Sequence, residues 1–204
     1  MTEKPWWTWS SLDNRVLEAA LGLALLLVGL FGVVLPILGV TGPLSPIRSR
    51  EVELDDLPQG PDIASAGSVT LRGTRTAELA FAHPDLTERL LLVLPDVVRA
   101  SLALLILELL RRMARTLRDG EIFAARNTRR LTIVALAVLV MGAVVPVLDA
   151  ITTRLLVSGA DLGRSIPFSY TISGPWLLLA LLVAAAAEAF RQGARLRADT
   201  EGLV

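Results

Sequence analysis

Long apolar runs dominate the pattern of hydrophobic and polar positions along the chain. Residues 19–40 contain no charged side chain, and at about 1.5 Å per helical residue such a run crosses a hydrocarbon core of roughly 30 Å. Residues 131–148 and 172–187 are likewise uncharged. Pro175 suits a first helical turn and Trp176 suits a membrane interface, so the last run is typical of a span that begins near the headgroups. These three runs predict three membrane-spanning helices.

A fourth apolar run, at residues 90–110, is interrupted by polar residues. It contains Pro95, Asp96, Arg99 and Glu108, and its longest uncharged stretch is residues 100–107. Its length nevertheless matches a membrane crossing. We therefore predict an all-α membrane protein with one membrane domain over residues 1–204 and four transmembrane helices, at about 17–40, 90–112, 130–152 and 174–195.

The first apolar run also has to be compared with a secretory signal peptide. The run is longer than the apolar region of a usual signal peptide, and the residues before it are only weakly basic. Residues 36–42 offer no small-residue cleavage site. We therefore expect the first span to be retained.

Residues 41–89, between the first two spans, change to a two-residue periodicity. Prolines and glycines break this segment into short pieces, and apolar side chains alternate with polar ones at three places. These places are Val52 and Leu54, Val69 and Leu71, and Leu79 and Phe81. The alternation predicts a small antiparallel sheet. Because such a sheet is marginal alone, we expect it to rest on helix ends or on a second copy of the chain, as in a homo-oligomer.

The distribution of arginine predicts the orientation in the membrane. The loop between spans two and three, about residues 113–129, and its flanks carry Arg111, Arg112, Arg115, Arg118, Arg126, Arg129 and Arg130. The C-terminal region, with a tail at 196–204, carries Arg191, Arg195 and Arg197, whereas the connection after span three has only Arg154 and Arg164. Basic loops remain cytoplasmic, so both termini are predicted inside and residues 41–89 outside. Lys4 is the only lysine, which is typical of a GC-rich bacterial genome, so we expect the bacterial cytoplasmic (inner) membrane.

Composition excludes several kinds of chemistry. The mean hydropathy is +0.58 with no net charge, and the absence of cysteine removes disulfides, thiol nucleophiles and thiolate metal sites. His83 is the only histidine, so one chain assembles neither a His-based metal site nor a catalytic triad. The acidic cluster of residues 51–56 could bind calcium, but a solvated strand face explains it better. We therefore expect no enzyme activity, no cofactor and no bound metal.

Charged residues inside the spans lie toward their ends rather than at the midplane. Arg99 and Asp149 have a similar depth near the outer ends of spans two and three, and we predict that they form a structural ion pair. Glu18, Glu108 and Glu188 lie near the inner ends of spans one, two and four, at the depth of several arginines. We expect these inner charges to form a network that ties the helix ends together.

Two groups of motifs carry a resemblance to a known family. The first is Gly120-Glu121-Ile122-Phe123, followed by Asn127 and Arg130-Leu131. The second is the sequence EAFRQG at residues 188–193, followed by Leu196, Asp199 and the ending EGLV at residues 201–204. With these motifs the chain resembles the bacterial domain of unknown function family 2975. The resemblance implies a four-helix membrane protein that is often encoded beside a small Xre-type helix-turn-helix regulator, and it implies no catalytic residue.

The mixed charge of the cytoplasmic face favours a non-enzymatic, regulatory membrane protein that docks a small cytoplasmic partner, such as that helix-turn-helix regulator. We predict that the partner-binding residues are Arg112, Arg115, Phe123, Asn127, Arg130, Arg195, Leu203 and Val204. The arginines are also expected to contact membrane lipids. Direct nucleic-acid binding is not expected, because the basic patch lacks interleaved aromatic residues. The alternative is a small oligomeric transporter or channel, although the spans offer mostly Leu, Ala and Val where a pore needs polar side chains.

Overall fold

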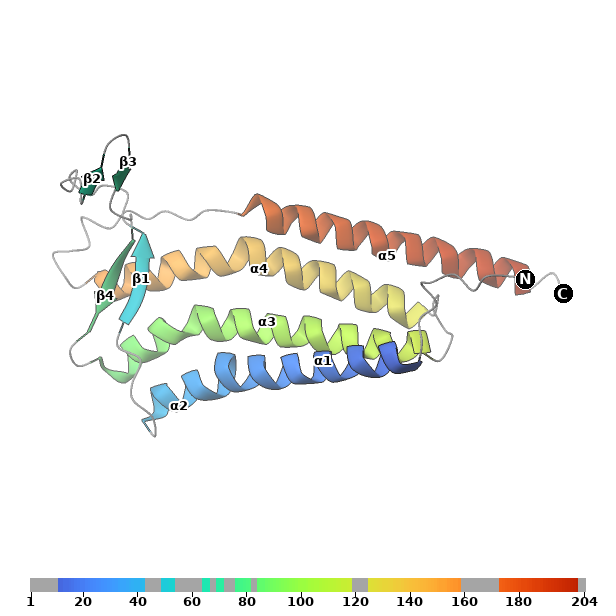
Figure 1. Cartoon of the computed structure of the whole chain (residues 1–204), viewed down its shortest axis with the longest axis horizontal. Helices are drawn as coiled ribbons and strands as arrows, with labels where there is room; N and C mark the ends of the chain where they lie inside the picture. The colour runs from blue at the N-terminus through green and yellow to red at the C-terminus, as the bar shows by residue number, and fades with distance from the viewer. Residues whose placement is uncertain are drawn as a thin grey trace. The chain divides into compact units, whose positions relative to one another are not determined.

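The computed structural model describes residues 11–42, 49–53, 64–66, 69–71, 76–81, 84–118, 125–158 and 173–201 (Figure 1). Its helices are α1 (Ser11–Gly29), the π-helix η1 (Leu30–Val34), α2 (Leu35–Thr41), α3 (Leu86–Arg118), α4 (Ala125–Val157) and α5 (Gly174–Glu201). Four helical stretches of the described chain are long and apolar enough to cross a membrane: Arg15–Thr41, Leu86–Thr116, Arg126–Val157 and Gly174–Leu196. The predicted four-span, nearly all-helical architecture is therefore confirmed.

The chain divides into two compact units. The first, the helical unit, comprises Met1–Val34, Val97–Val145 and Ile172–Val204. The second, the sheet unit, comprises Leu35–Asp96 and Pro146–Thr171. Both α3 and α4 continue from one unit into the other, and each has a proline next to the boundary, Pro95 in α3 and Pro146 in α4.

The first span contains a widened turn immediately before a proline. Pro36 has no N–H to donate, and its ring would clash with the carbonyl four residues earlier in a regular α-helix. The π-helix at Leu30–Val34 precedes it, and such a widened turn is a known way of accommodating a helix interruption. Gly32, inside this turn, allows a close approach to α3, because a Cβ there would lie 2.6 Å from the Cβ of Ala100.

In the helical unit, apolar side chains of α3, α4 and α5 form the core. Leu109 of α3, Val134 and Val138 of α4, and Ala180 of α5 make one buried cluster. Nearer the arginine-rich ends, Met113, Leu131 and Ala187 make a second cluster. The residues at 109, 113 and 116 recur at helical spacing on α3, as do those at 127, 131, 134 and 138 on α4, so each helix presents one continuous face to the core.

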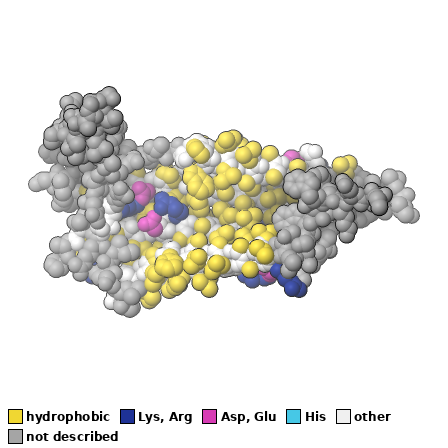
Figure 2. Space-filling view, viewed as in Figure 1, with side chains coloured by type: hydrophobic (Ala, Val, Ile, Leu, Met, Phe, Trp, Pro, Cys, Tyr) yellow, Lys and Arg dark blue, Asp and Glu magenta, His cyan; other side chains and the backbone are white. Residues whose placement is uncertain are grey.

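The apolar surface of the spans is largely exposed in the isolated chain. Leu181 is 67% exposed, Phe31 61% and Leu136 60%. In Figure 2, hydrophobic side chains cover the middle of the visible face over the helices. Exposed leucines in such numbers are unfavourable in water and favourable in lipid, so this surface fits a multi-pass membrane protein.

The sheet unit contains two small antiparallel pairs. Strand β1 (Ser49–Glu53) pairs with β4 (Thr76–Ala80), with Ser49 opposite Ala80 and Glu53 opposite Thr76. Strand β2 (Ala64–Ala66) pairs with β3 (Val69–Leu71). Strands thus occur at the three places where the sequence alternates, but β2 was not foreseen, because its sequence ASA is only three residues long and has no large apolar or β-branched side chain. The four described strands form two separate pairs rather than one sheet.

One arginine of β1 anchors its strand to α4 within the sheet unit. The Arg50 side chain is 10% exposed, forms an ion pair with Asp149, and donates a hydrogen bond of 3.0 Å to Thr152 Oγ1. Thr152 is 1% exposed and donates in turn to the Asp149 carbonyl at 3.0 Å. A guanidinium with five donors suits this position, since it satisfies a carboxylate and a buried hydroxyl together.

Candidate interaction site at the arginine-rich end of the helical unit

Basic side chains gather at one end of the helical unit, which we call the arginine end. It comprises the charged residues of α1, α3, α4 and α5 whose side chains are described there: Arg15, Glu18, Glu108, Arg111, Arg112, Arg115, Arg126, Arg129, Arg130, Glu188, Arg191 and Arg195. These are nine arginines against three glutamates, an excess of six positive charges. Arg115 lies in the last turn of α3, where the helix dipole favours cations.

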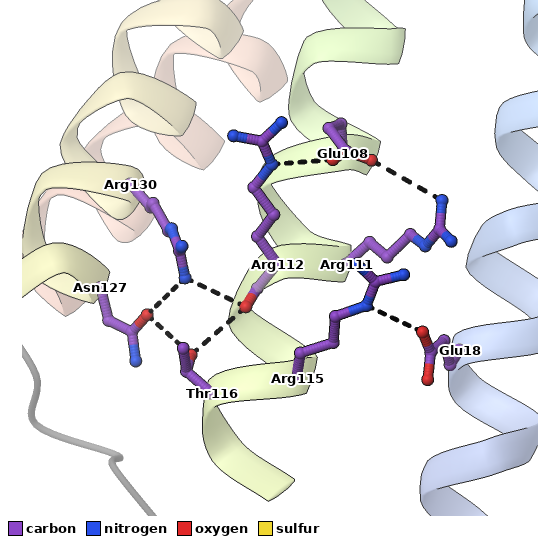
Figure 3. Close-up of polar contacts among 8 residues, drawn as sticks. All are labelled: Glu18, Glu108, Arg111, Arg112, Arg115, Thr116, Asn127 and Arg130. Carbon is purple, nitrogen blue, oxygen red and sulfur yellow. Dashed lines mark hydrogen bonds and ion pairs between the residues drawn. The ribbon is translucent and has the colours of Figure 1, made fainter. Parts of the chain in front are cut away.

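Polar contacts tie the end of α3 to the start of α4 (Figure 3). Asn127 is fully buried, and its Oδ1 accepts hydrogen bonds from Thr116 Oγ1 at 2.9 Å and from Arg130 Nη1 at 3.1 Å. Arg130 Nη1 also donates to the Arg112 carbonyl of α3 at 3.0 Å. The network therefore holds the two helix ends together at the loop that joins them.

The three glutamates each neutralise neighbouring arginines. Glu18 of α1 accepts a hydrogen bond from Arg115 of α3 at 2.8 Å, which links two spans. Glu108 pairs with Arg112 at 2.7 Å and lies 3.9 Å from Arg111. On α5, Glu188 pairs with Arg191 at 2.7 Å. The inner glutamates thus pair with neighbouring arginines as expected, and the Glu18–Arg115 pair joins two different helices.

Three arginines of this end are exposed and form neither a hydrogen bond nor a close ion pair with other described residues. They are Arg15 on α1, Arg129 on α4 and Arg195 on α5. An exposed guanidinium keeps all five donors available for a carboxylate or a phosphate. These three side chains are therefore the most accessible basic groups of the arginine end.

The structure divides the residues that the sequence assigns to partner binding. Arg112, Arg115 and Arg195 are exposed, Arg130 is partly buried in the network described above, and Asn127 is fully buried. Phe123, Leu203 and Val204 lie outside the described residues. Asn127 and Arg130 therefore act within the chain, whereas the exposed arginines remain available to a partner.

Sequence reasoning missed Thr116, although a signal for it exists. Thr116 lies on the same face of α3 as Leu109 and Met113, and Asn127 lies on the same face of α4 as Leu131 and Val134. One polar residue at the loop end of each apolar face is a pattern that suggests a hydrogen bond across the hairpin.

Arg50 and Thr152 were also missed, and no local signal identifies them. The sequence pairs Asp149 with Arg99, whereas the structure shows Asp149 paired with Arg50. An interaction of Asp149 with Arg99 stays a prediction.

An open groove lies between α4 and α5 at the arginine end, with a volume of about 180 Å³. Its lining residues are Thr128, Thr132, Ala135, Ala184, Ala187, Glu188 and Arg191. This volume is smaller than the roughly 300 to 1,000 Å³ of a pocket that encloses a whole drug-sized ligand. The groove therefore suits a part of a larger molecule.

Among the described residues, no group of three or more His, Asp or Glu side chains is arranged to hold a metal ion. The fold and this site together define a class: multi-pass helical membrane proteins with a strongly basic end. The sequence profile of the family described as "Protein of unknown function (DUF2975)" matches residues 76–204, and the chain belongs to this family. Neither the curated proteins nor the solved structures contain a match to the chain.

Proposed function

We propose that the protein is a non-enzymatic docking protein of the bacterial cytoplasmic membrane, whose arginine end faces the cytoplasm and binds an acidic surface of a small regulatory protein. The observation that carries this proposal is the excess of nine arginines over three glutamates among the described side chains of the arginine end, where Arg15, Arg129 and Arg195 are exposed and form no hydrogen bond or close ion pair with other described residues. The orientation rests on the rule that basic segments remain on the cytoplasmic side. Both termini are then cytoplasmic and β1–β4 lie outside.

The length of α5 favours a protein partner over lipid attraction alone. At about 1.5 Å per residue, Gly174–Glu201 is about 42 Å long, which exceeds the roughly 30 Å of the hydrocarbon core. The helix ends with the sequence RADTE at residues 197–201. Anionic lipid attracts arginine but not aspartate or glutamate, so a helix end of mixed charge suits a protein surface better.

The kind of partner comes from the family resemblance, which implies a small helix-turn-helix regulator encoded nearby. Regulation by membrane sequestration is the simplest consequence of such docking. The alternative of a transporter or channel has less support, because two of the polar side chains within the spans, Ser101 and Thr132, bond to their own helices. Ser101 Oγ donates to the Val97 carbonyl at 2.7 Å, and Thr132 Oγ1 donates to the Thr128 carbonyl at 3.1 Å.

The proposal is tested with the purified helix-turn-helix protein encoded beside the chain's own gene. Co-elution with the membrane protein in mild detergent is expected at low salt and is expected to weaken as salt rises. The double variant Arg129→Glu/Arg195→Glu should weaken binding about tenfold or more, because two attractive pairs of about 0.2–1 kcal/mol each become repulsive. Deletion of residues 199–204, which removes Leu203 and Val204, should also reduce binding.

Arg154→Glu is the matched control, since Arg154 is an exposed arginine near the other end of α4. It should leave binding unchanged. Equal binding by the double variant and the wild type, or equal loss in the Arg154→Glu control, would overturn the docking proposal.

A further inference from the structure

The lining of the groove between α4 and α5 changes from charged to apolar along its length, and this order matches one class of ligand. At its polar end lie Glu188 and Arg191, the only charged residues among those that line it. Both threonines, Thr128 and Thr132, line its α4 side. Ala135 on α4 lies one turn deeper into the apolar span, and Ala184 precedes Glu188 by one turn on α5.

This order places Glu188 and Arg191, which we call the charged rim of the groove, where the hydrocarbon core ends. Residues 174–187 of α5 are uncharged, so Glu188 is the first charged residue after the apolar part of the span. A phospholipid has the same sequence of chemical groups: a charged headgroup, polar ester groups and an apolar chain. The alanines leave room for an acyl chain because each lacks side-chain atoms beyond Cβ.

The charge of the rim selects among headgroups. Glu188 and Arg191 form a pair at 2.7 Å and carry no net charge together. Arg191 uses Nη2 for this pair, so its other donors remain available to a phosphate. The Glu188 carboxylate already accepts from Arg191 and, at 3.1 Å, from Gln192, and a carboxylate has about four acceptor sites. One further donor, such as a primary ammonium, can therefore be accommodated.

We propose that this groove is a binding site for a zwitterionic phospholipid with a primary ammonium headgroup, that is, a phosphatidylethanolamine. Arg191 binds the phosphate, Glu188 accepts a hydrogen bond from the ammonium, and one acyl chain lies along Thr132, Ala135 and Ala184. A purely anionic headgroup places negative charge beside Glu188, and a choline headgroup has no N–H to donate. This site is separate from the exposed arginines of the docking proposal and does not depend on it.

The first test measures lipid binding to the detergent-purified protein by native mass spectrometry. Phosphatidylethanolamine, phosphatidylcholine and phosphatidylglycerol with identical acyl chains are titrated in parallel. Phosphatidylethanolamine should bind about threefold more tightly than either of the others, because a partly exposed charge contact contributes only about 0.2–1 kcal/mol. Equal binding of the three lipids would overturn the assignment of the headgroup.

The second test uses two alanines that are neighbours on α5. Ala184 lines the groove, whereas Ala185 is exposed and is not among the lining residues. Ala184→Leu fills the groove and should reduce the binding of all three lipids at this site about tenfold, while Ala185→Leu should bind as the wild type does. Circular dichroism and gel filtration verify that both variants fold. Equal lipid retention by the two folded variants would overturn the location of the site.

Glu188→Gln separates recognition of the headgroup from filling of the groove. The amide keeps the size of the side chain but loses the negative charge that attracts the ammonium. The preference for phosphatidylethanolamine over phosphatidylcholine should fall to about one, while binding of phosphatidylglycerol should rise. A preference that survives this substitution would contradict the role of Glu188.

Discussion

Single polar side chains at the helix ends divide into those that hold the fold and those that stay accessible. Asn127 is fully buried and joins α3 to α4 through Thr116, so its amide serves the hairpin. Arg129, only two residues later, is exposed and has no partner among the described residues. Two residues that are close in sequence therefore differ in role: one stabilises the fold and the other is accessible to a partner, because successive residues of a helix point to different sides.

Asp149 provides the prediction at this scale. Arg50 is largely buried, so replacing Asp149 with Asn leaves a guanidinium without its counter-charge, and we expect a loss of about 1–2 kcal/mol in stability. The figure is moderate because the Asp149 side chain is 43% exposed. The double variant with Arg50→Gln should recover part of the loss. Unfolding in detergent, followed by circular dichroism, measures the double-mutant cycle.

A second cycle with Arg99→Gln shows whether Asp149 also interacts with Arg99, as the sequence predicts. A coupling energy near zero with Arg50 would mean that the ion pair contributes nothing to stability. A coupling energy of Asp149 with Arg99 but not with Arg50 would support the Arg99–Asp149 ion pair, which the sequence predicts from the similar depth of the two residues in the membrane.

At the scale of the helices, glycine and proline decide how closely the spans approach and where they bend. Gly32 lies in the π-helix before Pro36, and its missing side chain gives room to Ala100 of α3. Gly142 of α4 does the same for Trp176 of α5, whose side chain occupies the position where a Cβ would be. Small residues at span interfaces permit close backbone packing, which favours association in lipid.

The two glycines of the first span make a matched pair of variants. Gly32→Leu forces η1 and α3 apart and should destabilise the protein by about 1–3 kcal/mol, as overpacking does. A Cβ at Gly22 would meet no atom within 4 Å, so Gly22→Leu should be neutral or slightly stabilising, since leucine has the higher helix propensity. Thermal unfolding in detergent compares the two. Equal melting temperatures would show that the contact at Gly32 does not limit packing.

At the scale of the whole molecule, the asymmetry of arginine between the helix ends sets the expected orientation. The chain has no cysteine, so single cysteines can be introduced into the native sequence without a background. Thr87 is exposed in the first turn of α3, and Arg195 is exposed near the end of α5. These two positions report on opposite ends of the spans.

Labelling of intact cells with a membrane-impermeant maleimide tests the orientation. Thr87→Cys should react directly, and Arg195→Cys should react only after the cells are permeabilised, because the basic end remains inside. The loss of one arginine leaves eight among the described side chains of the arginine end, which is enough to maintain the asymmetry. The reverse pattern of labelling would place the termini outside and remove the basis of the docking proposal.

The sequence by itself determined the spans, their ends and the family. Whether a segment can cross the bilayer depends on its own length and polarity. An uncharged run of sufficient length therefore predicts a span, whatever other segments lie beside it. Local signals also accompany the helix ends: α3 ends at Arg118, before Asp119-Gly120, and α5 continues to Glu201 through Gly193, which has strong helix formers on both sides. The depth of each charge could likewise be counted along its own helix.

Only the tertiary structure decided which charges meet. Arg50 and Thr152 are 102 residues apart in sequence, and Glu18 and Arg115 are 97 apart. Depth is a property of one helix, but a contact also requires that two particular helix faces turn toward each other. That rotation is set by the packing of residues such as Gly32, Val134 and Ala180 against other spans, which no local pattern of the sequence contains.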